Sequence, residues 1–233
     1  QLVGELYDPS RFFKDRPDHD DPDEDYSGGD YRNQQLVTVG RLKFPESGTG
    51  LYWEWGREDH EHDLHGISKG WEHTQAKVLG WRQQYGTRRD WYTILEWADT
   101  LQPRNALTRP PGVLGWYNHN LYQNGWTYRG VILGHPMGAD AEMLAFSLGQ
   151  LTPALGWQFT LEQQRRGVRS VEMENSSASM IEVHRLFELD AQWRDGPREW
   201  RTLITTEELR NPGRRAKKTL HSQTLLLSWS RQW

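Results

Sequence analysis

The chain contains no cysteine and no long apolar run. Its 233 residues include 0 Cys, which excludes disulfide scaffolds, thiolate metal sites and cysteine nucleophiles. No stretch of about eighteen consecutive apolar residues occurs, so a transmembrane helix is excluded as well. Mean hydropathy is low, at -0.90, but a β-barrel in a membrane needs apolar residues only at alternate strand positions. The composition therefore leaves both a soluble all-β protein and a membrane barrel open.

The chain also lacks an excess of one charge sign. Its 28 Lys and Arg are interspersed with 32 Asp and Glu, which gives a net charge of -4. This balance argues against a nucleic-acid partner. Neither a Gly-x-Ser-x-Gly elbow nor a phosphate-binding loop occurs, and we expect no enzymatic activity, no cofactor and no metal. Tryptophan, by contrast, is abundant, with 13 residues. Trp is favoured both at membrane interfaces and in platforms that stack against sugars.

The chain is predicted to form a single domain, with an acidic first segment. Residues 18–25 are dominated by Asp and Glu next to prolines, and a block of like charges does not pack. We therefore interpret residues 1–34 mainly as an acidic loop. Calcium binding by 18–25 stays an open alternative, although the ligand spacing of an EF-hand is missing.

From residue 35 onward, apolar and polar residues alternate with the period of β-strands. We expect about ten antiparallel strands in 35–233, separated by turns such as PESGTG and NPGRRAKK. The run 181–194 alternates most clearly, with mostly apolar odd positions and mostly charged even positions. The strands are predicted over 35–44, 51–56, 70–84, 91–100, 142–150, 155–162, 181–194, 200–207 and 219–233.

The last residues favour a membrane barrel over a soluble sandwich. Leu225, Leu227 and Trp229 alternate with Ser228 and Ser230, and the chain ends on Trp233. A closing strand with an apolar face and a terminal aromatic residue is typical of bacterial outer-membrane barrels. In a soluble sandwich the same apolar residues would pack into a core.

The central segment resembles a known family. Residues 112–140 read GVLGWYNHNLYQNGWTYRGVILGHPMGAD, with an aromatic-Asn-His-x-x-Tyr run at 117–122, Asn-Gly-Trp at 124–126 and a Leu-Gly-x-x-x-Gly-x-Asp pattern at 133–140. This stretch resembles the signature of the capsule-assembly Wzi family of outer-membrane proteins. YWEWGRED at 52–59 and YTILEWADT at 92–100 are similar to two earlier strands of that family, in the same order.

The resemblance implies an antiparallel transmembrane β-barrel in the bacterial outer membrane, with about eighteen strands. It implies a monomer that binds capsular polysaccharide and anchors it to the cell surface as a non-enzymatic lectin. The present chain holds about half of those strands, so we expect it to cover roughly the C-terminal half of the barrel and to be incomplete at its N-terminus. The expected partners are capsular or exopolysaccharide, outer-membrane lipid and other envelope proteins.

Side chains suited to sugar binding cluster in the resembling segment. Sugar recognition uses aromatic faces for stacking together with amide, imidazole and carboxylate groups for hydroxyls. The same residues also suit an aromatic girdle at a membrane interface with a tight Asn-Gly turn. The candidate glycan-binding residues are Tyr117, Asn118, His119, Tyr122, Asn124, Trp126, Tyr128 and Asp140.

The sequence gives weaker support for a metal site and for glycoside hydrolysis. His60, His62 and His65 lie among acidic residues and suggest a metal site, but we expect a polar loop there. Glu54 and Glu96 lie on polar strand faces and would suit glycoside hydrolysis as a pair, but we expect them to brace the interior. The alternative functions are a passive pore or envelope scaffold without glycan binding, and a soluble all-β carbohydrate-active enzyme.

Overall fold

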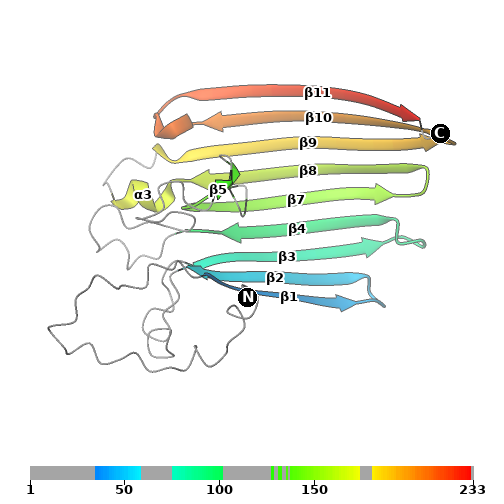
Figure 1. The fold of residues 1–233 in the computed structure, drawn as a ribbon, viewed down its shortest axis with the longest axis horizontal. Helices are drawn as coiled ribbons and strands as arrows, with labels where there is room; N and C mark the ends of the chain where they lie inside the picture. The colour runs from blue at the N-terminus through cyan, green and yellow to red at the C-terminus, as the bar shows by residue number, and fades with distance from the viewer. Residues whose placement is uncertain are drawn as a thin grey trace, which may run out of the picture.

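The protein folds into one large antiparallel sheet. The structure, a computed structural model, describes residues 35–58, 75–101, 127–128, 131–132, 135, 137–173 and 180–231. Nine strands lie side by side in the order β1-β2-β3-β4-β7-β8-β9-β10-β11 (Figure 1). The predicted all-β antiparallel fold is confirmed. The strands are β1 (Gln35–Phe44), β2 (Thr49–Glu58), β3 (Gln75–Tyr85), β4 (Trp91–Asp99), β7 (Ala141–Leu151), β8 (Leu155–Arg166), β9 (Glu182–Asp195), β10 (Arg198–Arg210) and β11 (Thr219–Arg231).

Four smaller elements accompany the sheet. The two-residue strands β5 (Thr127–Tyr128) and β6 (Val131–Ile132) pair with each other as a separate ribbon. The short helix α3 (Val168–Met173) follows β8, and the 3-10 turn η5 (Pro212–Arg214) connects β10 to β11. Among the described residues, no helix combines the length and the apolarity that crossing a membrane requires.

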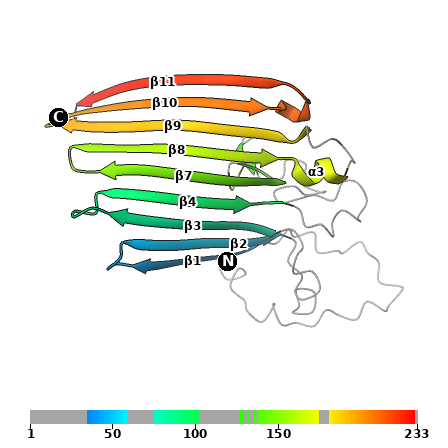
Figure 2. The ribbon, with the colours of Figure 1, turned by 180° about the vertical axis from the view of Figure 1, so that it is seen from behind.

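The connections differ in length at the two ends of the sheet. At one end, which we call the turn end, neighbouring strands are joined through 45–48, 86–90, 152–154 and 196–197. At the other, the loop end, they are joined through 59–74, 100–140, 167–181 and 211–218. Figures 1 and 2 show the tight hairpins on one side and α3 on the other. Within the described residues the sheet is open, and β1 and β11 form its two edges.

The register separates the side chains into an apolar face and a polar face, because residues directly opposite in neighbouring strands point to the same side. One row pairs Trp53, Leu79, Trp97 and Leu144 in succession, and the adjacent row pairs Tyr52, Gly80, Glu96 and Ala145. The apolar face consists of Leu51, Trp53, Leu79, Trp81, Leu95, Trp97, Leu144, Phe146, Phe159, Leu161, Phe187, Leu189, Ile204, Leu225, Leu227 and the residues aligned with them.

Buried apolar side chains gather at the loop end of the sheet. One cluster joins Ala98, Met137, Ala141 and Met143, and a second joins Val168 to Ile181. The apolar face, in contrast, stays open: Leu227 is 70% exposed, Trp229 54% and Phe187 39%. Among the described elements, substantial contacts link neighbouring strands, β5 with β6, and β9 with η5. The apolar residues of the strands therefore do not form the core of a two-layer sandwich in the described structure.

Candidate functional site

Tryptophan side chains line the turn end of the apolar face. The rings of Trp91 and Trp157 meet edge to face with their centroids 5.6 Å apart. Trp193 and Trp200 stack at 5.9 Å, and Trp200 contacts Trp229 at 6.0 Å. Cross-strand aromatic pairs of this kind stabilise neighbouring strands. We call Trp91, Trp157, Trp193, Trp200 and Trp229 the aromatic belt.

The apolar face ends in charged side chains towards the loop end. Arg165 forms an ion pair with Glu142, and Arg185 Nη1 lies 3.1 Å from Glu208 Oε1. Lys77 and Asp99 occupy paired positions on the same face. On β4 the apolar stretch runs from Trp91 to Trp97, which corresponds to about 20 Å along an extended strand. The face is thus an apolar band with the aromatic belt at one border, and with Trp97 followed by charges at the other.

The polar face contains a tyrosine that crosses a neighbouring strand. The Tyr52 hydroxyl of β2 donates a hydrogen bond to Glu96 on β4, passing over Gly80 of β3. A Cβ atom on Gly80 would lie 1.8 Å from Tyr52 Cζ, so glycine is required there. His135 Nε2 lies 4.0 Å from the other oxygen of Glu96. Glu96 therefore connects β2 and β4 with a residue of the β6–β7 connection.

The same arrangement occurs a second time on the polar face. The Tyr92 hydroxyl of β4 donates to Gln158 Oε1 of β8 at 2.9 Å, and its ring covers Gly149 of β7. A Cβ on Gly149 would lie 2.5 Å from Tyr92 Cζ. Each glycine thus provides the space for a phenol that ties together two strands that are not neighbours.

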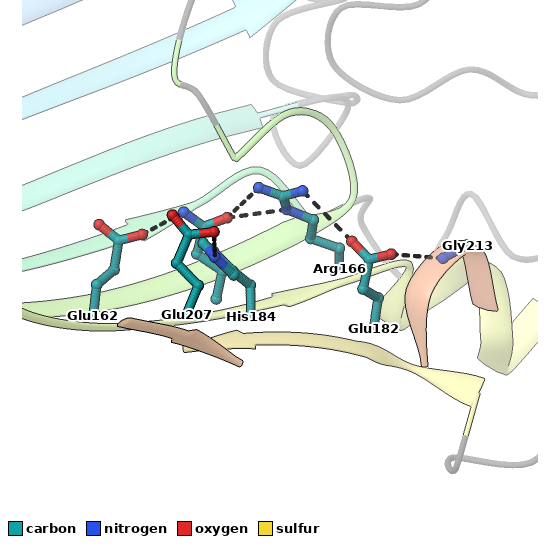
Figure 3. A network of polar contacts seen from close by, with 7 residues as sticks. Glu162, Arg166, Glu182, His184, Glu207 and Gly213 are labelled. Atoms are coloured by element: carbon teal, nitrogen blue, oxygen red, sulfur yellow. Dashed lines mark hydrogen bonds and ion pairs between the residues drawn. The ribbon is translucent and has the colours of Figure 1, made fainter. Parts of the chain in front are cut away.

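A longer chain of polar contacts follows the loop end of β8, β9 and the β10–β11 connection (Figure 3). Gln164 donates to Glu162, and Arg166 Nε donates to Gln164 Oε1 at 3.0 Å. Arg166 Nη1 lies 3.5 Å from Glu182 Oε1, and the other oxygen of Glu182 accepts from the Gly213 backbone at 2.8 Å. Beside this chain, His184 Nε2 lies 3.8 Å from Glu207 Oε2. The polar face is braced by contacts among its own side chains.

Asp140, a predicted glycan-binding residue, has a defined place at the loop end. Its carboxylate accepts hydrogen bonds from the Arg169 and Ser170 amides at 2.9 Å each and from the Ser170 hydroxyl at 2.6 Å. Its side chain thereby caps the first turn of α3. The residue is 6% exposed and adopts a left-handed backbone with φ of 51°. Its carboxylate is engaged within the fold, and a role in glycan binding stays a prediction.

The other candidates fall mostly outside the described residues. Tyr117, Asn118, His119, Tyr122, Asn124 and Trp126 lie there, as do the acidic run 18–25 and the histidines His60, His62 and His65. For Tyr128 the structure describes the backbone, as part of β5. Within the described residues, no group of three or more His, Asp or Glu side chains is arranged to hold a metal ion.

The sequence alone did not predict the contacts between several residues of the polar face. Alternation predicted that Glu96 lies on a polar face, but its partners Tyr52 and His135 come from distant parts of the chain. The sequence positions of Gly80 and Gly149 could have indicated these contacts, because an isolated glycine within a strand often marks the close approach of another group. Identifying that group requires the register of the strands.

The register and the two-faced sheet agree with the comparison with protein families. A family model described as capsule assembly protein Wzi matches residues 39–223. The chain belongs to this family. The match begins within β1 and ends within β11, so it includes β2 to β10 and part of each edge strand of this Wzi-family protein. Comparison with curated proteins gives no match, and comparison with solved structures gives none either.

Proposed function

We propose that this Wzi-family protein lies in the bacterial outer membrane, where its sheet forms part of a β-barrel wall, and that it holds capsular polysaccharide at the cell surface. The observation that carries the proposal is the coincidence of the family match with a sheet that is apolar on one face and polar on the other. A protein that assembles capsule must act where the polymer meets the cell envelope.

The dimensions of the apolar face support a membrane location. An outer-membrane barrel shows lipid an apolar band about 25 Å tall, flanked by aromatic girdles. Here the apolar stretch of about 20 Å along β4 begins at the aromatic belt and gives way to ion pairs such as Arg185–Glu208. An exposed apolar surface of this extent would be unfavourable in water. Short turns at one end and long connections at the other also match such barrels, whose longer loops face outward.

The proposal includes binding without hydrolysis. A glycoside hydrolase needs one carboxyl group to protonate the leaving group and a second to attack or activate water. Glu96 is hydrogen-bonded to Tyr52 and lies near His135, and Glu182 contacts both Arg166 and the Gly213 amide. These contacts favour a bracing role for the carboxylates of the polar face.

Deleting the gene in an encapsulated host strain tests the proposed function. We expect capsular polysaccharide to move from the cell fraction to the medium, with total amount and chain length unchanged, because synthesis continues while retention fails. Re-expression of the wild-type protein should restore retention. A Trp126→Ala variant should fail to restore it, whereas Tyr85→Ala, at the turn end, should succeed. Capsule that stays cell-bound in the deletion strain would contradict the proposal.

A further inference from the structure

The connection between β10 and β11 concentrates positive charge. Residues 209–219 contain five basic residues and no acidic one, although the net charge of the chain is -4. Because β10 and β11 are neighbours, this segment forms one corner of the sheet at the loop end (Figure 1). We call residues 211–218 the basic turn. The basic residues of the segment are Arg210, Arg214, Arg215, Lys217 and Lys218.

The backbone of the basic turn is held by several hydrogen bonds. Asn211 donates from its amide to Lys218 O at 2.7 Å, accepts at Oδ1 from the Lys217 amide at 3.0 Å, and donates from Nδ2 to Ile181 O at 2.9 Å. The Gly213 amide is bound to Glu182, so the turn is also attached to the start of β9. A turn fixed in this way loses little conformational freedom when it binds a ligand.

Three of the five cations face outward from this fixed turn. Arg210 Nε lies 2.6 Å from Glu208, and Arg214 is half-buried. Arg215, Lys217 and Lys218 are exposed. None of the ion pairs found among the described residues involves these three side chains. They form a compact set of cations available to a ligand.

We propose that the basic turn binds acidic polysaccharide through the carboxylates of its uronate residues. This inference rests on the proposed function and adds to it a site and the charge of the polymer. Guanidinium and ammonium groups form charge-assisted hydrogen bonds with carboxylates, and Arg215 can do so through two parallel bonds. A polymer presents many such carboxylates, so successive sugar units can engage neighbouring cations.

The position of the turn favours a glycan over the phosphates of lipid headgroups. Leu225 is the last apolar residue of β11 on the apolar face, and Lys218 precedes it by seven positions. With about 3.3 Å per residue and a tilt of about 45°, the turn lies roughly 15 Å beyond that level. The headgroup layer extends only about 5–8 Å beyond the hydrocarbon. The basic turn therefore projects past the headgroups into the space that surface polysaccharide occupies.

Binding of defined polymers to the purified protein in detergent tests the site. The triple variant Arg215→Gln, Lys217→Gln, Lys218→Gln is compared with a control that carries Lys43→Gln, Arg88→Gln and Arg198→Gln. The control removes the same charge from exposed positions at the turn end. We expect polygalacturonate to bind the wild type and the control equally, and the triple variant at least tenfold more weakly. Added salt should weaken binding to the wild type by screening, and neutral dextran of equal length should not distinguish the proteins.

Three outcomes overturn the site. If the triple variant binds polygalacturonate like the wild type, the basic turn is not the site, while the capsule-retention role stands or falls with the deletion strain. If the wild type does not bind polygalacturonate, the site is wrong, and cell-bound capsule in the deletion strain would reject the proposed function as well. Bisphosphorylated lipid A should stabilise the wild type and the triple variant equally against unfolding. If the triple variant keeps polygalacturonate binding but is no longer stabilised by lipid A, the turn is a lipid site instead.

Discussion

Three glycines within the strands allow aromatic rings from neighbouring strands to lie across the backbone of the sheet. Gly80 and Gly149 each lie under a tyrosine from a neighbouring strand, and Gly40 on the apolar face lies under Trp53, whose Cζ2 would be 2.0 Å from an added Cβ. In each case an aromatic ring covers the bare backbone of the next strand. The arrangement offsets the weakness that glycine brings to a strand, because the ring supplies the contacts that the missing side chain would make.

Replacing Gly80 with alanine should therefore destabilise the protein. The new methyl group displaces the Tyr52 ring and breaks its hydrogen bond to Glu96, at a cost of about 1–3 kcal/mol in the free energy of unfolding. Urea titration of the protein folded in lipid vesicles measures this. Gly50→Ala is the matched control on the same face, since its Cβ would meet nothing nearer than Leu42 O at 3.8 Å. Equal stability of the two variants would show that the ring moves aside without loss.

The sequence predicted which face of a strand these residues occupy, but not which residues they contact. Alternation assigned Glu96 to the polar side of its strand correctly, since a strand has a period of two residues. It gave no indication that Tyr52 reaches Glu96, because that contact depends on the register of two strand pairs. His135 comes close to Glu96 from a connection whose path no periodic pattern describes.

At the scale of elements, the long connections are anchored at their points of return to the sheet. Thr100 and Asp140 exchange backbone hydrogen bonds with neighbouring residues across the β4–β7 connection, among them Asp140 N to Thr100 O at 3.1 Å. The Gly167 amide donates to Asp140 O at 2.8 Å, and the Asp140 carboxylate caps α3. One residue thus joins the end of one connection to the start of the next.

Asp140→Ala should expose the first turn of α3. It removes the acceptor for the Arg169 and Ser170 amides and places alanine at a positive φ, so we expect a loss of about 1–2 kcal/mol and faster hydrogen exchange at both amides. Asp140→Asn keeps one acceptor oxygen and tolerates the left-handed backbone, so it should retain most of the protection. If α3 stays protected in both variants while polysaccharide binding is lost, Asp140 acts on the glycan as the sequence suggested.

The strands were predictable where apolar and polar residues alternate over a long stretch. Residues 155–162 and 181–194 correspond to β8 (Leu155–Arg166) and β9 (Glu182–Asp195) within a few positions. The boundaries moved where polar residues continue a strand past its apolar stretch, as in β8. Helix α3 was missed, since its six residues are too few for a helical period and its cap, Asp140, is distant in sequence.

For the whole molecule, the proposed outer-membrane location depends on contact between the apolar face and lipid. The proposed retention of capsular polysaccharide depends on that location. Family membership is shown by the match over residues 39–223, whereas the contact with lipid is inferred from the shape and composition of the sheet. The two faces make this inference testable, because adjacent residues of one strand point in opposite directions.

Ile204 and Leu203 provide that test on β10, a strand with neighbours on both sides. Ile204 lies on the apolar face beside Leu189 and Leu225, and Leu203 lies on the polar face opposite Asp190. If the apolar face meets hydrocarbon, Ile204→Arg should lower the stability in lipid vesicles by about 2–4 kcal/mol, because the charge must be desolvated. Leu203→Arg should cost much less, because its charge stays in water on the polar face, where Arg201 already pairs with Asp190. Urea titrations of both variants in vesicles measure the difference, and equal losses would mean that the two faces meet the same solvent.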